Sequence, residues 1–195
     1  MPSERWKSID HHDSGAVAVE TTFVSMLLII ILFGIVETSF LFRDWISVSA
    51  AARAGARMGA SQPRSPSFAQ DTASQVTNAI SSLDAANIQE VWVYRAAVTT
   101  DPLTSTNKPV GFSNFSNCTT CVKFTWNAGT KSLSQSYGNW SYASQNACAG
   151  DGARDSLGVY VKYKHTSPLG FFFKNFIISE SAVMWIEPTS AAVCK

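Results

Sequence analysis

The 195-residue sequence has few of the side chains that enzymes use for catalysis. Of its three histidines, His11 and His12 are neighbours near the N-terminus and His165 lies far along the chain, so no histidine pair is expected in one pocket. Two adjacent histidines supply too few ligands for a metal ion. A glycine-rich phosphate loop and a G-x-S-x-G elbow are also absent from the sequence. We therefore expect neither an enzyme nor a protein that binds a metal ion or a cofactor.

The sequence also lacks an excess of charge of either sign. Fifteen lysines and arginines stand against fourteen aspartates and glutamates, which leaves a net charge of +1 and a pI near 7.7. Nucleic-acid-binding domains usually carry a basic face, so nucleic acid is not an expected partner. Residues 16–42 hold a disproportionate share of the hydrophobic side chains. The roughly 150 residues that remain are enough to bury one modest core.

The apolar run from Thr21 to Phe42 contains no proline, and its only charged residue is Glu37. At about 1.5 Å per residue, a helix of this length crosses a ~30 Å hydrocarbon core. A secretory signal peptide is the alternative, but its apolar region has only about 7–15 residues and follows a basic segment. Residues 1–14 instead mix acidic and basic side chains. We predict a transmembrane helix that the mature protein retains.

Two features predict opposite orientations for this helix. Four arginines follow the apolar run, and the positive-inside rule would keep them in the cytoplasm. All the cysteines also follow it, and an even number of cysteines in such a domain indicates an oxidising compartment. We follow the cysteines and predict a single-pass protein with an extracytoplasmic C-terminal domain. The arginines are Arg43, Arg53, Arg57 and Arg64, and the cysteines are Cys118, Cys121, Cys148 and Cys194.

No proline or strong turn signal lies between the apolar run and Gln62, so the helix is predicted to cover residues 16–61 without a break. Its second half is rich in small residues, and Gly55 and Gly59 form a small-xxx-small pair beside alanines at four-residue spacing. Such a stripe lets another helix approach closely, in the same chain or in another. A solvated alanine-rich helix is the alternative.

The sequence from residue 62 to residue 195 predicts an α+β head. Apolar residues at three- and four-residue spacing between Phe68 and Leu83 predict one amphipathic helix, which would cover one face of an antiparallel sheet of about four strands. Four segments rich in β-branched and aromatic residues supply these strands. The polar segment 131–155 is predicted as a long loop that is functional or covalently held. The predicted strands are residues 88–98, 121–127, 158–165 and 177–188.

The C-T-T-C sequence from Cys118 to Cys121 has the spacing of half a zinc site or of a redox motif. Redox motifs place their cysteine at the start of a helix, whereas the residues after Cys121 predict a strand. We therefore predict structural disulfides, with Cys148 and Cys194 as the other candidates. Four cysteines allow three pairings, and the sequence does not choose among them. A bridge from Cys118 or Cys121 to Cys148 would close a loop of ~30 residues and stabilise the fold by about 3–4 kcal/mol.

Glu20 lies at the edge of the apolar run, where an ionised carboxylate is costly unless it is paired. Cleavage after Gly15 would supply a partner, because the new amino group on Ala16 would lie one helical turn before Glu20. The pairing would be within one molecule or with a packed neighbour. The alternative is an acid at the start of an ordinary membrane anchor, where the helix dipole favours it.

Gly15, the following AVAV, Glu20 and the apolar helix together resemble the processing site of type IV prepilins, which a membrane aspartic peptidase cuts after the glycine. With Glu37 and the sequence AARAGAR at 51–57, this region resembles the TadE-like pseudopilins of the tight-adherence (Tad/Flp) pilus system. The sequences GVYVKYKH and SESAVMWIEP are similar to the closing strands of that family. The resemblance covers residues 15–60 and, more loosely, residues 157–188.

The resemblance implies a pilin-like fold and a minor pilin or pseudopilin of a Tad-type pilus that serves adhesion. Residues 1–15 would be the prepilin leader, and the expected partners are the prepilin peptidase, other pilins and pseudopilins, the Tad assembly machinery and the bacterial cytoplasmic membrane. Assembly would involve Glu20, Glu37, Gly55 and Gly59. The sequence leaves a second function open. The protein would then be a membrane-anchored extracytoplasmic binding module that contacts its ligand through the aromatic residues of segment 131–155.

Overall fold

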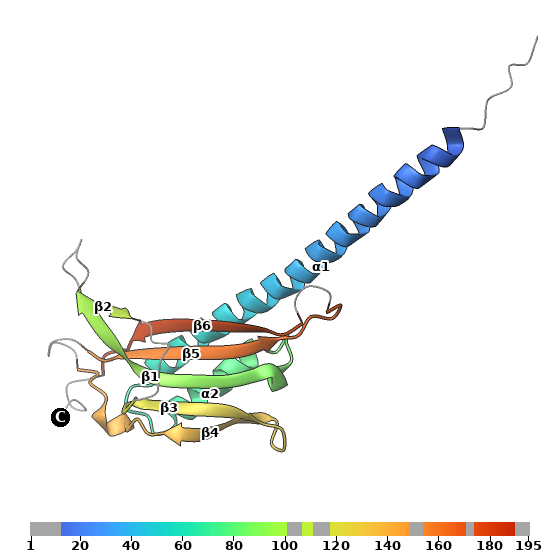
Figure 1. Ribbon diagram of the computed structural model, residues 1–195. Coiled ribbons are helices and arrows are strands. Elements are labelled where there is room, and N and C mark those ends of the chain that lie inside the picture. The colour runs from blue at the N-terminus through green and yellow to red at the C-terminus, as the bar shows by residue number, and fades with distance from the viewer. Residues whose placement is uncertain (1–12, 101–106, 111–117, 149–153, 171–173, 190–195) are drawn as a thin grey trace, which may run out of the picture.

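The computed structural model describes residues 13–100, 107–110, 118–148, 154–170 and 174–189. Its dominant element is the helix α1 (Asp13–Ala60), which has 48 residues and extends from the rest of the molecule as a long rod (Figure 1). The helix ends just before Gln62 and Pro63, as the absence of an earlier turn signal predicted. The predicted continuous helix is therefore confirmed within the described residues.

The second half of α1 is part of the head rather than a rod in water. One of its faces is fully buried, and the buried residues are small, which lets the backbone of α1 come close to its neighbours. The short helix α2 (Phe68–Ala79) packs against this face and buries Phe68, Thr72, Ala73 and Val76. The buried hydrophobic residues of α1 are Val48, Ala51, Ala52, Ala56 and Ala60.

Five antiparallel strands form the sheet of the head, in the order β4-β3-β1-β5-β6, and the short strand β2 pairs with the end of β1. The α+β prediction is confirmed, with five strands in the sheet rather than about four. The strands are β1 (Ile88–Thr100), β2 (Asn107–Val110), β3 (Cys121–Asn127), β4 (Ser132–Gly138), β5 (Ser156–His165) and β6 (Phe176–Trp185). Two short 3₁₀ helices, η1 (Ala85–Asn87) and η2 (Tyr142–Ser144), complete the described elements.

Strand β4 lies in the segment that the sequence predicted as a loop. Its sequence SLSQSYG has neither the β-branched residues nor the apolar alternation that identified the other strands, because β4 is an edge strand with only Leu133 buried. Pairing with β3 supplies its backbone hydrogen bonds. The loop prediction for residues 131–155 is therefore wrong at β4 and at η2.

The core lies between the two helices and one face of the sheet (Figure 1). Side chains alternate between the faces of a strand, so Val91 and Val93 of β1 point into this core while Trp92 and Tyr94 belong to a smaller cluster on the other face. Strand β5 continues the core with its buried valines. The result is a two-layer head in which the second half of α1 is a core element.

Charged residues on the outer face of the sheet form a small network around Glu90. Its carboxylate lies 2.7 Å from the ammonium of Lys123 and 3.4 Å from that of Lys162, on the two strands that flank β1. Partial burial raises the pKa of Glu90, but the hydrogen bond and charge of Lys123, with smaller contributions from Trp92 and Lys162, outweigh it and lower the pKa below 4.5. The ionised carboxylate therefore stabilises the folded sheet.

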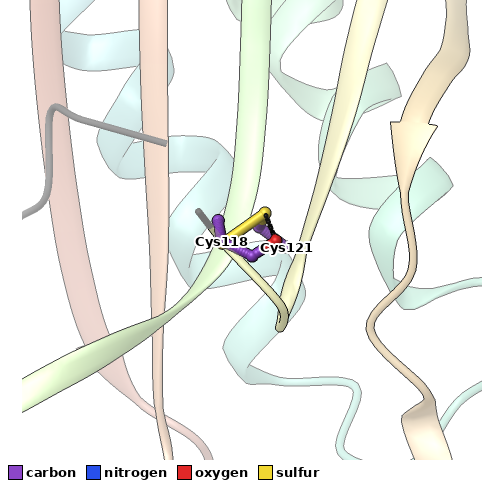
Figure 2. The surroundings of a disulfide bond; sticks show 2 residues. All are labelled: Cys118 and Cys121. Atoms are coloured by element: carbon purple, nitrogen blue, oxygen red, sulfur yellow. Dashed lines mark hydrogen bonds between the residues drawn. A yellow bond between two sulfur atoms is a disulfide. The ribbon is translucent and has the colours of Figure 1, made fainter. Parts of the chain in front are cut away.

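A disulfide joins Cys118 and Cys121 where the chain enters β3 (Figure 2). The bridge falls inside the C-T-T-C sequence, so neither of these cysteines closes a long loop to Cys148. Cys148 is also disulfide-bonded, and Cys194 lies outside the described residues. Cys121 begins a strand rather than a helix, and no cluster of metal-binding side chains occurs in the described ranges.

Candidate processing and assembly site

The predicted processing residues lie together at the free end of α1. Gly15, Ala16 and Glu20 all fall within the helix, so Ala16 and Glu20 are separated by about one turn. Glu20 is exposed, and apart from the adjacent backbone of α1 itself, nothing in the described structure lies within 4 Å of the position that a Cβ at Gly15 would occupy. The head therefore does not cover the proposed cleavage site.

The N-terminal half of α1 is apolar, and no other described element packs around it. The most apolar 18 residues of this helix have a mean hydropathy of 2.4, and none of them is buried. Phe23 is 71% exposed and Ile35 is 63% exposed. By length and composition this helix can cross a membrane. An apolar surface of this extent needs lipid or other helices to cover it.

Glu37 differs from the rest of the apolar run because its side chain is fully buried. The hydroxyl of Ser167, which lies in the connection between β5 and β6, donates a hydrogen bond of 3.0 Å to Oε1 of Glu37. The backbone N–H of Gly170 donates to that same hydroxyl at 3.2 Å. The β5–β6 connection therefore lies over α1 and shields the carboxylate of Glu37 from the surroundings of the helix.

A second buried acid follows seven residues later on the same face of α1. Oδ2 of Asp44 lies 2.6 Å from Nδ1 of His165, the last residue of β5, and the two residues are 5% and 1% exposed. Arg43 also reaches Asp44 at 3.2 Å, but its side chain is 57% exposed. Burial raises the pKa of the neighbouring Tyr163, and the carboxylate of Asp44 raises it further.

Glu37, Asp44, His165 and Ser167 are here called the polar latch. They join the middle of α1 to the β5–β6 end of the sheet by two polar contacts. Sequence reasoning identified Glu37 but missed Asp44, and it treated His165 only as a lone histidine. The signal was present as two acids seven residues apart on a helix, but nothing in the sequence specified their partners.

Gly55 and Gly59 lie in the packed half of α1. A Cβ at Gly55 would lie 2.6 Å from Cγ2 of Val76 on α2, and one at Gly59 would contact Thr72 and lie 2.8 Å from Cδ1 of Leu157 on β5. The small-residue stripe was predicted to pack within the chain or against another chain, and the structure shows it packed against α2 and β5 of the same chain. A role of these glycines between chains stays a prediction.

The predicted site residues thus form separate groups along α1. The processing residues lie about 30 Å along the helix from Glu37, and Glu37 lies about 27 Å from Gly55, at a rise of 1.5 Å per residue. The free end can be reached by a membrane enzyme or a neighbouring helix, whereas Glu37 and the glycines take part in the fold of the head. This arrangement defines a protein with one candidate membrane helix built into a two-layer α+β head.

The model of the TadE-like protein family matches residues 15–57, which covers most of α1 and none of the strands. The resemblance of the N-terminal region to TadE-like proteins is therefore confirmed, and it associates the chain with Tad pilus systems and with a membrane. No curated protein matches the chain, and no solved structure does. The similarity of the closing strands to that family lies outside the matched residues.

Proposed function

We propose that the protein is a minor pilin or pseudopilin of a Tad-type pilus and not an enzyme. Residues 1–15 are the prepilin leader, residues 16–61 the membrane and extended helix, and residues 62–195 the extracytoplasmic head. A prepilin peptidase cuts after Gly15, and the mature chain enters or supports a pilus that serves adhesion. The observation that carries this proposal is the Gly15–Glu20 spacing at the exposed end of α1, inside the TadE-like match.

The chemistry of assembly rests on Glu20. Cleavage leaves a positively charged amino group on Ala16 at the edge of the hydrocarbon, and Glu20 places a negative charge within reach. Each charge alone is costly in this environment, and pairing offsets much of that cost. Pairing between neighbouring chains would favour side-by-side packing of the exposed apolar helices, whose surface has no cover in the single chain.

An extracytoplasmic head is supported by the disulfide between Cys118 and Cys121, because structural disulfides persist in oxidising compartments. Two of the arginines that argue for the opposite orientation are already engaged in the fold. Arg43 pairs with Asp44, and Arg64 donates through Nε to the backbone carbonyl of Gln145. These contacts form in the folded protein, so the proposed orientation rests on the disulfide and not on them.

The test is to co-express the full chain with its prepilin peptidase and to read the mature N-terminus by mass spectrometry. We expect a chain that begins at Ala16. A Gly15→Leu variant should remain uncut, while a Gly129→Ala variant, which changes a glycine in a head turn, should be cut like the wild type. An intact leader on the wild-type chain in a membrane with active peptidase would refute the proposal.

A second candidate is a membrane-anchored binding module that never enters a pilus. Tyr137 and Tyr142, at the end of β4 and in η2, are 55% and 42% exposed, and exposed aromatic rings are typical of surfaces that contact glycans or receptors. This candidate predicts that the uncut, membrane-anchored chain has full function. Loss of pilus formation in the uncut Gly15→Leu variant would support the minor pilin and contradict the binding module.

A further inference from the structure

The exposed apolar side chains of the head are not spread evenly. Among the described residues after Glu37, nine large hydrophobic residues are exposed, and six of them belong to α1 just after Glu37 or to the region around the β5–β6 connection. Figure 1 shows this end of the sheet beside α1, where the helix leaves the head. The six are Phe42, Trp45, Ile46, Leu169, Phe176 and Ile177.

Four of these residues line one groove between α1 and the start of β6. The groove has a volume of about 460 Å³, and Phe42, Trp45, Phe176 and Ile177 supply its apolar walls. The rings of Phe42 and Trp45 meet edge to face at 5.3 Å, and the indole N–H of Trp45 donates to the carboxylate of Glu180. These four residues are here called the membrane-proximal patch.

The position of the patch along α1 matches the boundary of a bilayer. With Glu20 at one edge of the hydrocarbon, the next twenty residues, through Phe40, span about 30 Å. Phe42 and Trp45 then follow within about 8 Å of the opposite edge, in the headgroup layer. Glu37 falls inside the hydrocarbon, and the β5–β6 connection that covers it must therefore reach the same depth.

We propose that the membrane-proximal patch docks into the headgroup layer and outermost acyl region of the bilayer, so that the head lies against the membrane surface. The patch is continuous with the candidate membrane span and brings β6 to the same level. Tryptophan with a satisfied N–H is favoured at such interfaces. Two exposed cations suit lipid phosphates: Arg43, which lies between Phe42 and Trp45 and also contacts Asp44, and Lys174, two residues before Phe176.

The test uses the full, uncut chain in nanodiscs, so it does not depend on peptidase processing. Tryptophan emission is quenched by lipids brominated near the headgroup or by iodide in the water, and the difference between wild type and Trp45→Phe isolates Trp45. We expect bromolipid to reduce the Trp45 emission at least twofold and iodide to have little effect. Emission that iodide quenches and bromolipid does not would overturn the proposal.

Substitution in the patch provides a second measurement. Ile177→Asp should weaken the bromolipid quenching of Trp45 at least twofold, while Val98→Asp, at an exposed position of β1, should leave it unchanged. If the patch instead binds a second copy of the chain, iodide should quench Trp45 in nanodiscs that hold one chain and should fail to quench it in nanodiscs that hold two. That outcome would also overturn the membrane assignment, whether or not Ile177→Asp folds.

Discussion

The polar latch predicts a large and non-additive effect of substitutions at Asp44 and His165. The two side chains are buried, and 2.6 Å separates Oδ2 of Asp44 from Nδ1 of His165. His165→Ala leaves the buried carboxylate with only the exposed Arg43, and removal of one partner from a buried pair costs about 3–5 kcal/mol. For a head of this size the midpoint of thermal unfolding should fall by roughly 10 °C.

The assay is urea unfolding of the full chain in detergent micelles, followed by tryptophan fluorescence. Asp44→Ala, His165→Ala and the double variant form a cycle, and we expect a coupling free energy of about 1–3 kcal/mol. Lys162→Ala is the matched control, because Lys162 lies on β5 like His165. It removes a partly exposed ion pair with Glu90 of β1 and should cost less than about 1 kcal/mol. Single variants that each cost less than the control, or that add without coupling, would refute the latch.

Three further predictions concern the packing, the sheet and the membrane end of the helix. Gly59→Leu should lower the free energy of unfolding by about 1–3 kcal/mol in the same assay, because even a Cβ would lie 2.8 Å from Leu157. The pKa of Glu90 is lower in the folded protein than its ordinary value of 4.5, so its ionised form contributes stability above that pH and the contribution is lost as the pH falls through the folded-state pKa. Urea midpoints measured across the acid range should show this loss, and Glu90→Gln should remove it. Glu20→Ala should leave a protein that inserts into the membrane but is not recovered in sheared pilus fractions.

Each of these predictions has its own control or contrary outcome. Ala50→Leu enlarges an exposed side chain of α1 and should be tolerated, and equal losses for Ala50→Leu and Gly59→Leu would argue against tight packing at the glycine. An acid profile that is the same for wild type and Glu90→Gln would remove Glu90 as a contributor. Normal recovery of Glu20→Ala in pili would contradict the charge-pairing role.

The local pattern of side chains in the sequence was enough to predict much of the fold. An apolar run of this length predicted a helix that can cross a membrane, and the absence of proline and of strong turn signals before Gln62 predicted its extension, since both depend on neighbours along one helix. The amphipathic spacing after Phe68 predicted α2, and runs of β-branched and aromatic residues predicted the four apolar strands. The spacing of Gly15 and Glu20 predicted the resemblance that the TadE-like match at residues 15–57 confirmed.

The tertiary structure decided what depends on contacts between distant residues. Strand β4 is polar and exists because β3 supplies its hydrogen bonds, so no local signal marked it. Asp44 and His165 are 121 residues apart in the chain, and their pairing follows from the antiparallel order that brings the end of β5 to α1. The sequence by itself determined a helix that can cross a membrane and an α+β head. Only the fold decided that Glu37 is shielded by the β5–β6 connection, because a buried polar group requires a partner that sequence spacing alone cannot place.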